Sequence, residues 1–184
     1  MKENEKRSLV KELYEKYPYP SRETITKEGA VYFAEWVAKI IKENKFFWKG
    51  KKLLELGCGT GELACGLALL GANVIGIDFS ENSIKKAKEN AKKLDCTEKT
   101  HFIIKDILEI KENELGEFDA VIALGSLHHT INAKKGFEIA IEHTKENGIV
   151  IIGLYNKYSR AKLRAKRALI KFFAGNNIEK RIKK

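Results

Sequence analysis

The chain has 184 residues, a length that fits one domain with a short appendage. Its net charge of +10 lies entirely at the C-terminal end, where residues 155–184 hold 11 Lys and Arg and one acidic residue. The first 154 residues hold 24 basic and 24 acidic residues and are therefore neutral overall. The N-terminus is charged rather than apolar, no uncharged run is long enough to span a membrane, and the three cysteines have neither disulfide nor zinc spacing. We therefore expect a cytoplasmic protein without a metal site.

Alternating strand and helix patterns predict the fold. Two helices come first, at 8–17 and 27–43, the first ending before a Tyr-Pro-Tyr-Pro turn. Short apolar runs bounded by Gly, Asp or Asn then predict buried strands at 52–56, 73–77, 100–105, 118–124 and 148–154. Helical patterns separate them at 62–70, 80–94 and 133–144. This order predicts an α/β fold with a doubly wound, mainly parallel sheet of about five strands and right-handed crossovers.

The last segment differs in composition from the rest. In 157–184, apolar and basic residues each recur at helical spacing, which predicts a basic amphipathic helix. Such a helix can bind RNA phosphates or an anionic membrane surface, or it can dock its apolar stripe and leave its charges in solvent. We divide the chain into an N-terminal helical cap (1–45), a central domain (46–156) and this basic segment.

The most informative motif is Gly-Cys-Gly-Thr-Gly at 57–61, which joins a predicted strand to a helix. Glycine is needed where the backbone takes positive φ or approaches a ligand, and the start of a helix offers free N–H groups. The next strand ends at Asp78, where a carboxylate can accept both hydroxyls of a ribose. A dinucleotide fingerprint would need glycine at position 62, where this chain has Glu62. The pattern, preceded by Glu55, favours a nucleoside ligand without a pyrophosphate.

These residues resemble the class I S-adenosylmethionine-dependent methyltransferases. ELGCGTGELA at 55–64 matches the first motif of that family, and the resemblance continues to residue 156 through Asp78, Asp106 and FDAVIALGSLHHT at 118–130. The Leu-His-His after the fourth strand points to the small-molecule branch. The resemblance implies S-adenosylmethionine as cofactor and a small-molecule or lipid-like methyl acceptor.

The resemblance also implies which residues bind the cofactor. The loop glycines would line the methionine and ribose with Glu55 near the amino group, Asp78 would hold the ribose hydroxyls, and Asp106 would accept a hydrogen bond from the adenine. The full set is Glu55, Gly57, Gly59, Gly61, Asp78, Phe79, Asp106, Ile107, Leu124 and Gly125.

Candidates for the chemistry follow the fourth and fifth strands. Methyl transfer from a sulfonium is an in-line displacement, so the protein aligns donor and acceptor and needs a base only when the acceptor carries a proton. Either His128 or His129 can act as that base, or one packs while the other caps the next helix. The candidate substrate-binding residues are Tyr17, Tyr19, Tyr155 and Asn156; the two tyrosines of the proline turn either close over the pocket or pack the first helix.

The chain departs from the family after its fifth strand. Members of the family usually add an antiparallel hairpin after that strand. In this chain only the basic helical segment follows it, so we predict a sheet without the hairpin. We expect the strand at 148–154 to lie near an edge that the tail helix or a second copy of the chain, in a homodimer, covers. Alternative functions are an RNA (tRNA) methyltransferase that uses the basic tail, a truncated non-catalytic methyltransferase-like binding module and, more distantly, a nicotinamide oxidoreductase.

Overall fold

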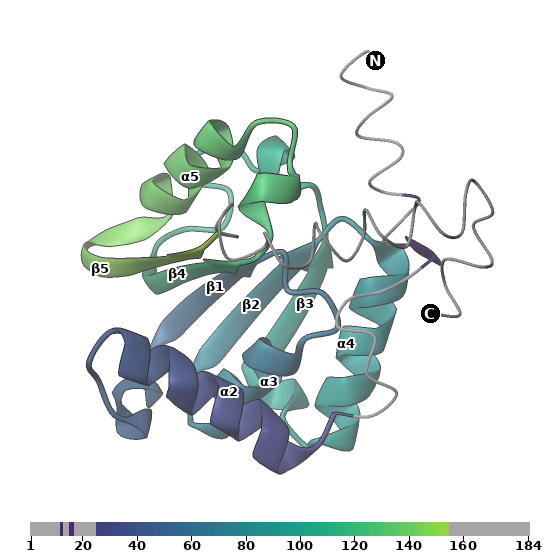
Figure 1. Cartoon of the computed structure of the whole chain (residues 1–184), viewed down its shortest axis with the longest axis vertical. Coiled ribbons are helices and arrows are strands. Elements are labelled where there is room, and N and C mark those ends of the chain that lie inside the picture. Colours follow the sequence, from purple (N-terminus) through teal and green to yellow (C-terminus); the bar gives the residue numbers. More distant parts are fainter. Residues whose placement is uncertain (1–11, 13–14, 17–24, 155–184) are drawn as a thin grey trace, which may run out of the picture. The chain divides into compact units, whose positions relative to one another are not determined.

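A five-stranded, entirely parallel sheet forms the centre of the computed structural model (Figure 1). Its order is β3-β2-β1-β4-β5, with the strands at Lys52–Leu56 (β1), Asn73–Asp78 (β2), Thr100–Ile104 (β3), Phe118–Leu124 (β4) and Thr144–Gly153 (β5). The helices are Lys27–Ile40 (α2), Glu62–Leu69 (α3), Glu81–Lys93 (α4) and Ala133–Glu142 (α5). Single 3₁₀ turns lie at Lys45–Trp48 (η1), Thr97–Lys99 (η2), Ile107–Glu109 (η3) and Leu127–His129 (η4). The predicted α/β fold is confirmed.

The structure describes residues 12, 15–16 and 25–154. The three described residues before 25 are helical, within the helix predicted at 8–17. Tyr17, Tyr19, Tyr155, Asn156 and the predicted basic segment lie outside the described residues. The chain divides into two compact units, Met1–Gly153 and Leu154–Lys184, and the sheet with its helices belongs to the first.

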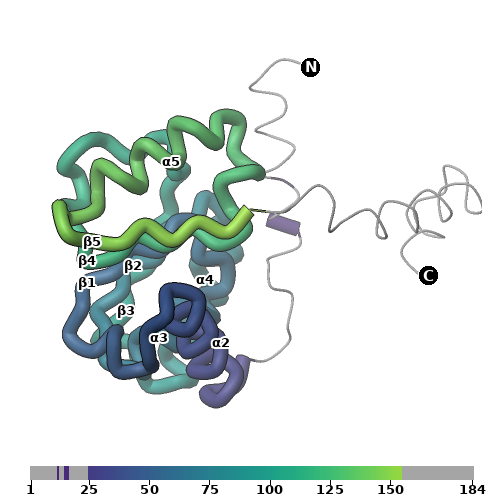
Figure 2. Tube along the Cα trace, turned by 60° about the vertical axis from the view of Figure 1, so that its left-hand side comes forward, coloured from purple at the N-terminus to yellow at the C-terminus, as the bar shows by residue number. Residues whose placement is uncertain are grey.

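Helices cover both faces of the sheet. In Figure 2, α5 lies on one side of the sheet and α2 and α3 lie on the other. One apolar cluster joins α2, α3 and α4 to one face, and a second joins α5, η3 and η4 to the other. Alternate residues of β1 supply the two clusters: Leu53 faces the first, and Leu54 and Leu56 face the second. The strand is therefore buried on both sides, which explains why its sequence is a continuous apolar run.

The helices α2 and α3 approach each other closely at a glycine. A Cβ added to Gly66 would lie 2.0 Å from the carbonyl oxygen of Ala30, so only glycine permits this contact. The indole N–H of Trp48 donates to the carbonyl of Ala34 at 3.1 Å and attaches η1 to the same helix. Helix α2, which we assigned to an N-terminal cap, thus packs directly on the helix that follows the glycine motif.

The strand predicted at 148–154 differs most from its observed boundaries. β5 begins at Thr144, immediately after α5, and Thr144 pairs with Phe118 before the register shifts and regular pairing resumes. In this irregular stretch Lys145 Nζ lies 2.7 Å from Asp119 Oδ1. The polar run at 145–148 has no alternation, so its pattern could not reveal that the backbone stays extended.

The strand order locates the functional edge. Successive strands run outward from β1 in one direction to β3, and the chain then returns to the other side of β1 with β4. In open α/β sheets, ligands bind outside the carboxyl ends of the strands at such a reversal. The loops after β1 and β4 are therefore where a ligand site is expected.

Candidate cofactor-binding site

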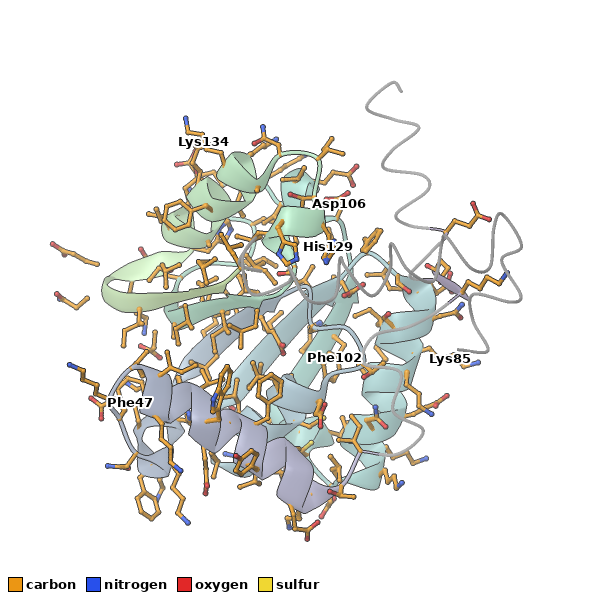
Figure 3. All side chains as sticks on the ribbon, in the orientation of Figure 1. Phe47, Lys85, Phe102, Asp106, His129 and Lys134 are labelled. Atoms are coloured by element: carbon orange, nitrogen blue, oxygen red, sulfur yellow. The ribbon has the colours of Figure 1, made fainter. Side chains whose placement is uncertain are left out.

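A pocket opens at the carboxyl ends of the strands, at the reversal of strand order. It is lined by residues that end or follow β1, β2, β3 and β4: Gly57, Gly59, Asp78, Phe79, Asp106, Ile107, Leu108, Leu124, Gly125, Ser126, His129, Thr130 and Ile131. Asp106 and His129, which come from the loops after β3 and β4, mark its position (Figure 3). Eight of the ten residues predicted to bind a cofactor line this pocket; Glu55 and Gly61 do not.

The glycine loop is held by hydrogen bonds within the protein. The N–H groups of Gly57 and Cys58 both donate to the carbonyl of Ile77, at 2.7 and 2.9 Å, and Gly61 N–H donates to Cys58 at 2.9 Å. From α4, the amide of Asn90 donates to the carbonyl of Thr60 at 2.9 Å. The loop therefore has a defined shape that the adjacent strand and α4 support.

The three loop glycines all have positive φ, but they serve two purposes. Their φ angles are 76°, 53° and 77° for Gly57, Gly59 and Gly61. The first two line the pocket, whereas a Cβ at Gly61 would meet Ala87 at 2.9 Å and the ring of Phe102 at 3.0 Å. Gly61 thus permits the close packing of α3 against α4 and β3, and its contact with a ligand stays a prediction.

Asp78 is the central polar group of the pocket. Its Oδ2 accepts the N–H of Gly59 at 2.9 Å, and its Oδ1 accepts the N–H of Ser80 at 3.0 Å. Burial raises the pKa of this carboxyl, while the backbone hydrogen bonds from Ser80 and Gly59 oppose the rise. A backbone hydrogen bond from Phe79 acts in the same direction as these two. A carboxylate offers about four lone-pair sites, so acceptor capacity remains for a ligand hydroxyl, such as those of a ribose.

The remaining predicted cofactor residues lie on the other walls. Asp106 begins η3 by accepting the N–H of Leu108 at 2.8 Å, and Ile107 follows it. Gly125, with φ of 77°, donates its N–H to the carbonyl of Gly153 at 2.8 Å. These residues and the half-exposed Phe79 surround the pocket with apolar side chains and one further carboxylate, a composition that suits an adenine ring and its amino group.

Glu55 lies beneath the loop rather than at the pocket surface. Its side chain is on β1, and its carboxyl group accepts a hydrogen bond from the N–H of Ala64 in the first turn of α3. Burial raises the pKa of Glu55 to about 8; the Ala64 hydrogen bond lowers it and the charge of Asp78 adds to the rise. None of the described residues gives its Oε2 a hydrogen bond. Contact with a ligand amino group stays a prediction.

The raised pKa of Glu55 predicts how stability depends on pH. From its ordinary value of 4.5 up to about 8, the folded chain keeps a proton that the unfolded chain releases. The contribution of Glu55 to the free energy of unfolding is therefore complete below pH 4.5. As the pH rises from there toward 8, the free energy of unfolding falls by about 1.4 kcal/mol per pH unit. Glu55→Gln should remove this slope in urea unfolding measured at pH 5.5 and 7.5. The exposed Glu98→Gln should keep it, and equal slopes in wild type and Glu55→Gln would contradict the prediction.

The two candidate histidines occupy different positions. His129 lines the pocket, whereas His128 does not. Their rings lie 4.1 Å apart between centroids and are tilted by 45°. Both belong to η4, directly after β4, so the structure brings one of the two to the same cavity as Asp78 and Asp106.

Sequence reasoning missed four lining residues: Leu108, Ser126, Thr130 and Ile131. Ser126 is the most informative, since its hydroxyl donates to the carbonyl of Leu56 at 2.6 Å and its Cβ faces Gly57. It joins the loops after β1 and β4. The sequence did offer one signal for Ser126: it lies two residues after β4, a strand next to the reversal of strand order, where ligands bind in such sheets.

The described residues contain neither a metal-binding cluster nor a membrane-spanning helix. In 12, 15–16 and 25–154, no group of three or more His, Cys, Asp or Glu could hold a metal ion. No helix in that part of the chain is long and apolar enough to cross a bilayer.

Comparisons with known proteins agree with this architecture. The family model described as "Methyltransferase domain" matches residues 48–183. Among curated proteins, the ubiquinone biosynthesis O-methyltransferase of Dechloromonas aromatica is 35% identical over 114 residues, covering 62% of this chain and 48% of that protein. The enzyme of the same name from Rickettsia prowazekii is 32% identical over 129 residues, covering 70% and 50%. The chain thus spans about half of the length of these relatives.

Solved structures share the fold. Magnesium protoporphyrin IX methyltransferase from Synechocystis, determined with S-adenosylhomocysteine, superposes with a TM-score of 0.63 at 18% identity, covering 89% of this chain and 79% of that one. A methyltransferase from Geobacter sulfurreducens in complex with S-adenosylhomocysteine gives 0.54 at 19% identity, covering 80% and 54%.

Proposed function

Because this chain belongs to the class I S-adenosylmethionine-dependent methyltransferase family, we propose that it transfers a methyl group from S-adenosylmethionine to a small-molecule acceptor. One observation carries the proposal: Gly57, Gly59, Asp78 and Asp106 line a single pocket at the reversal of strand order. When bound there, S-adenosylmethionine supplies a methyl group already activated on a sulfonium.

The residues of the pocket fit this cofactor in kind. Asp78 keeps acceptor capacity beside its backbone hydrogen bonds, which suits the ribose hydroxyls. Asp106 is the carboxylate available to the amino group of adenine, and Phe79 and Ile107 provide apolar surface for the ring. Gly57 and Gly59 let the backbone approach the methionine portion closely.

A small-molecule acceptor is supported by the relatives and the pocket. The curated relatives are named for ubiquinone biosynthesis, and the Synechocystis neighbour for a porphyrin. Beside the residues assigned to the cofactor, the lining includes Leu108, Thr130 and Ile131, which are mostly apolar and suit a small or lipid-like molecule. The RNA alternative depends on residues 157–184, which lie outside the described part of the chain.

For a hydroxyl acceptor, His129 is our candidate for the base. In that reaction His129 would accept the proton that the acceptor hydroxyl loses as its oxygen takes up the methyl group of S-adenosylmethionine. His129→Asn should lower kcat about a hundredfold, a larger effect than any on cofactor affinity, since general-base catalysis contributes on that order. His101→Asn, on the exposed side of β3, is the matched control. A loss of kcat in His128→Asn instead would assign the role to the neighbouring ring.

The function itself is tested by incubating the full chain with methyl-labelled S-adenosylmethionine and a fractionated cell extract. We expect label in the low-molecular-weight or lipid fraction. Label in nuclease-sensitive material would show an RNA acceptor. Binding of S-adenosylhomocysteine by calorimetry with no transfer into any fraction would support the non-catalytic alternative, and neither binding nor transfer would refute the proposal.

A further inference from the structure

The start of α4 lies beside the pocket, and each of its first backbone N–H groups has an acceptor. Ser80 N–H donates to Asp78 at 3.0 Å, and Ser83 N–H donates to the hydroxyl of Ser80 at 3.1 Å. The two N–H groups between them, of Glu81 and Asn82, donate to Glu15. The helix therefore uses a distant carboxylate to complete its own cap.

Glu15 makes a bidentate contact from 66 residues earlier in the chain. Its Oε1 accepts the N–H of Glu81 at 2.8 Å and its Oε2 accepts that of Asn82 at 3.2 Å. In return, the side-chain amide of Asn82 donates to the backbone carbonyl of Glu15 at 2.9 Å. A carboxylate at a helix N-terminus gains from charge-assisted hydrogen bonds and from the helix dipole, so this contact is specific as well as favourable.

The contact acts on the segment that carries two pocket residues. Asp78 and Phe79 directly precede the capped amides, and Asp78 also accepts the N–H of Gly59. One series of hydrogen bonds thus leads from Glu15 through the start of α4 to Asp78 and the glycine loop. The charge of Glu15 also adds to the burial that raises the pKa of Asp78, as expected for two neighbouring carboxylates.

The start of α2 lies beside the start of α3, the helix that follows the glycine loop. Ile25 is buried, and Thr26 caps α2 by accepting the N–H of Gly29 at 3.1 Å. A Cβ at Gly29 would lie 3.9 Å from Oε1 of Glu62, the first residue of α3. Both α3 and α4 follow strands whose ends form the pocket.

We propose that Glu15 is a positioning residue of the cofactor site: it holds the start of α4, with Asp78 and Phe79, in the arrangement that binds the nucleoside, and it couples the N-terminal segment to cofactor occupancy. The inference rests on the proposed cofactor but concerns a residue that lies outside the pocket lining. By linkage, a contact that favours binding is itself favoured when the ligand is bound.

The test compares Glu15→Ala with Glu12→Ala, an exposed glutamate on the same segment, in the full-length chain. We expect the Kd for S-adenosylhomocysteine, measured by calorimetry, to rise about tenfold in Glu15→Ala and to stay unchanged in Glu12→Ala. Glu15→Gln, which keeps accepting oxygen but loses the charge, should have an intermediate Kd. It also provides the comparison if the alanine variant folds poorly.

A second measurement separates positioning from general stability. Saturating S-adenosylhomocysteine should slow tryptic cleavage after Lys16 in wild type and in Glu12→Ala, but not in Glu15→Ala. If Glu15→Ala lowers Tm yet keeps wild-type affinity and ligand-dependent protection, Glu15 only stabilises the fold and the inference is wrong. Failure of wild type itself to bind S-adenosylhomocysteine would instead refute the proposed function, and the inference with it.

Discussion

Asp78→Ala is expected to raise the Kd for S-adenosylhomocysteine about a thousandfold. The carboxylate is the group proposed to accept both ribose hydroxyls, and two charge-assisted hydrogen bonds at about 2 kcal/mol each give a loss of this order. The substitution also removes the acceptor of Gly59 N–H and Ser80 N–H, so the loop and the start of α4 lose a shared contact. Calorimetric titration of the full chain measures the effect directly.

Two further variants isolate the cause. Asp78→Asn keeps the size of the side chain but has one accepting oxygen, so it should bind far more weakly than wild type while folding better than Asp78→Ala. Asp95→Asn makes the same chemical change at an exposed residue with φ of 56°, a conformation that asparagine tolerates, and should bind as wild type does. Wild-type affinity in both Asp78 variants would place the ribose elsewhere.

Gly57→Ala is expected to lower the free energy of unfolding by about 3 kcal/mol and to remove cofactor binding. About 1 kcal/mol comes from placing a non-glycine residue at φ of 76°, since Cβ is crowded in that region. The added Cβ would also lie 2.3 Å from the Cβ of Ser126, and such overpacking costs on the order of 2 kcal/mol. Relieving the clash must separate the loops after β1 and β4, which form two walls of the pocket.

The chain contains a matched control for this substitution. Gly50 has the same φ of 76°, but a Cβ there would meet nothing within 4 Å. Gly50→Ala therefore carries the backbone cost alone, about 1 kcal/mol, and should bind S-adenosylhomocysteine normally. In Gly57→Ala/Ser126→Gly the clash disappears, although the hydroxyl that donates to Leu56 is lost as well. Urea unfolding of the double variant should therefore show a loss about 2 kcal/mol smaller than the sum of the two single losses. Equal losses for both single glycine variants would show that the contact with Ser126 has no energetic consequence.

Much of the fold could be predicted because local pattern and tertiary structure agree. The bounds of β1 and β4 match the predicted runs at both ends, since each strand is buried on two faces and bounded by polar residues or glycine. The glycine motif and the acid at the end of the next strand likewise depend on short-range spacing. They identify a pocket edge before any side chain is placed.

The parts that could not be predicted depend on contacts between distant residues. Ser126 faces Gly57 only because β4 lies beside β1, and Glu15 meets Asn82 across 67 positions. The raised pKa of Glu55 could not be predicted either, because the sequence around a glutamate before a glycine motif does not show that the side chain is buried. Gly61 shows the converse: it belongs to the motif, yet it is needed for packing against Phe102.

The internal hydrogen bonds of the glycine loop have a thermodynamic consequence. Four N–H groups in the loop, those of Gly57, Cys58, Gly59 and Gly61, already have acceptors within the protein. The conformational entropy of this segment is therefore lost when the chain folds and need not be lost again when a ligand arrives. Ligand affinity at this edge of the sheet is, in that sense, partly established during folding, by hydrogen bonds that form without the ligand.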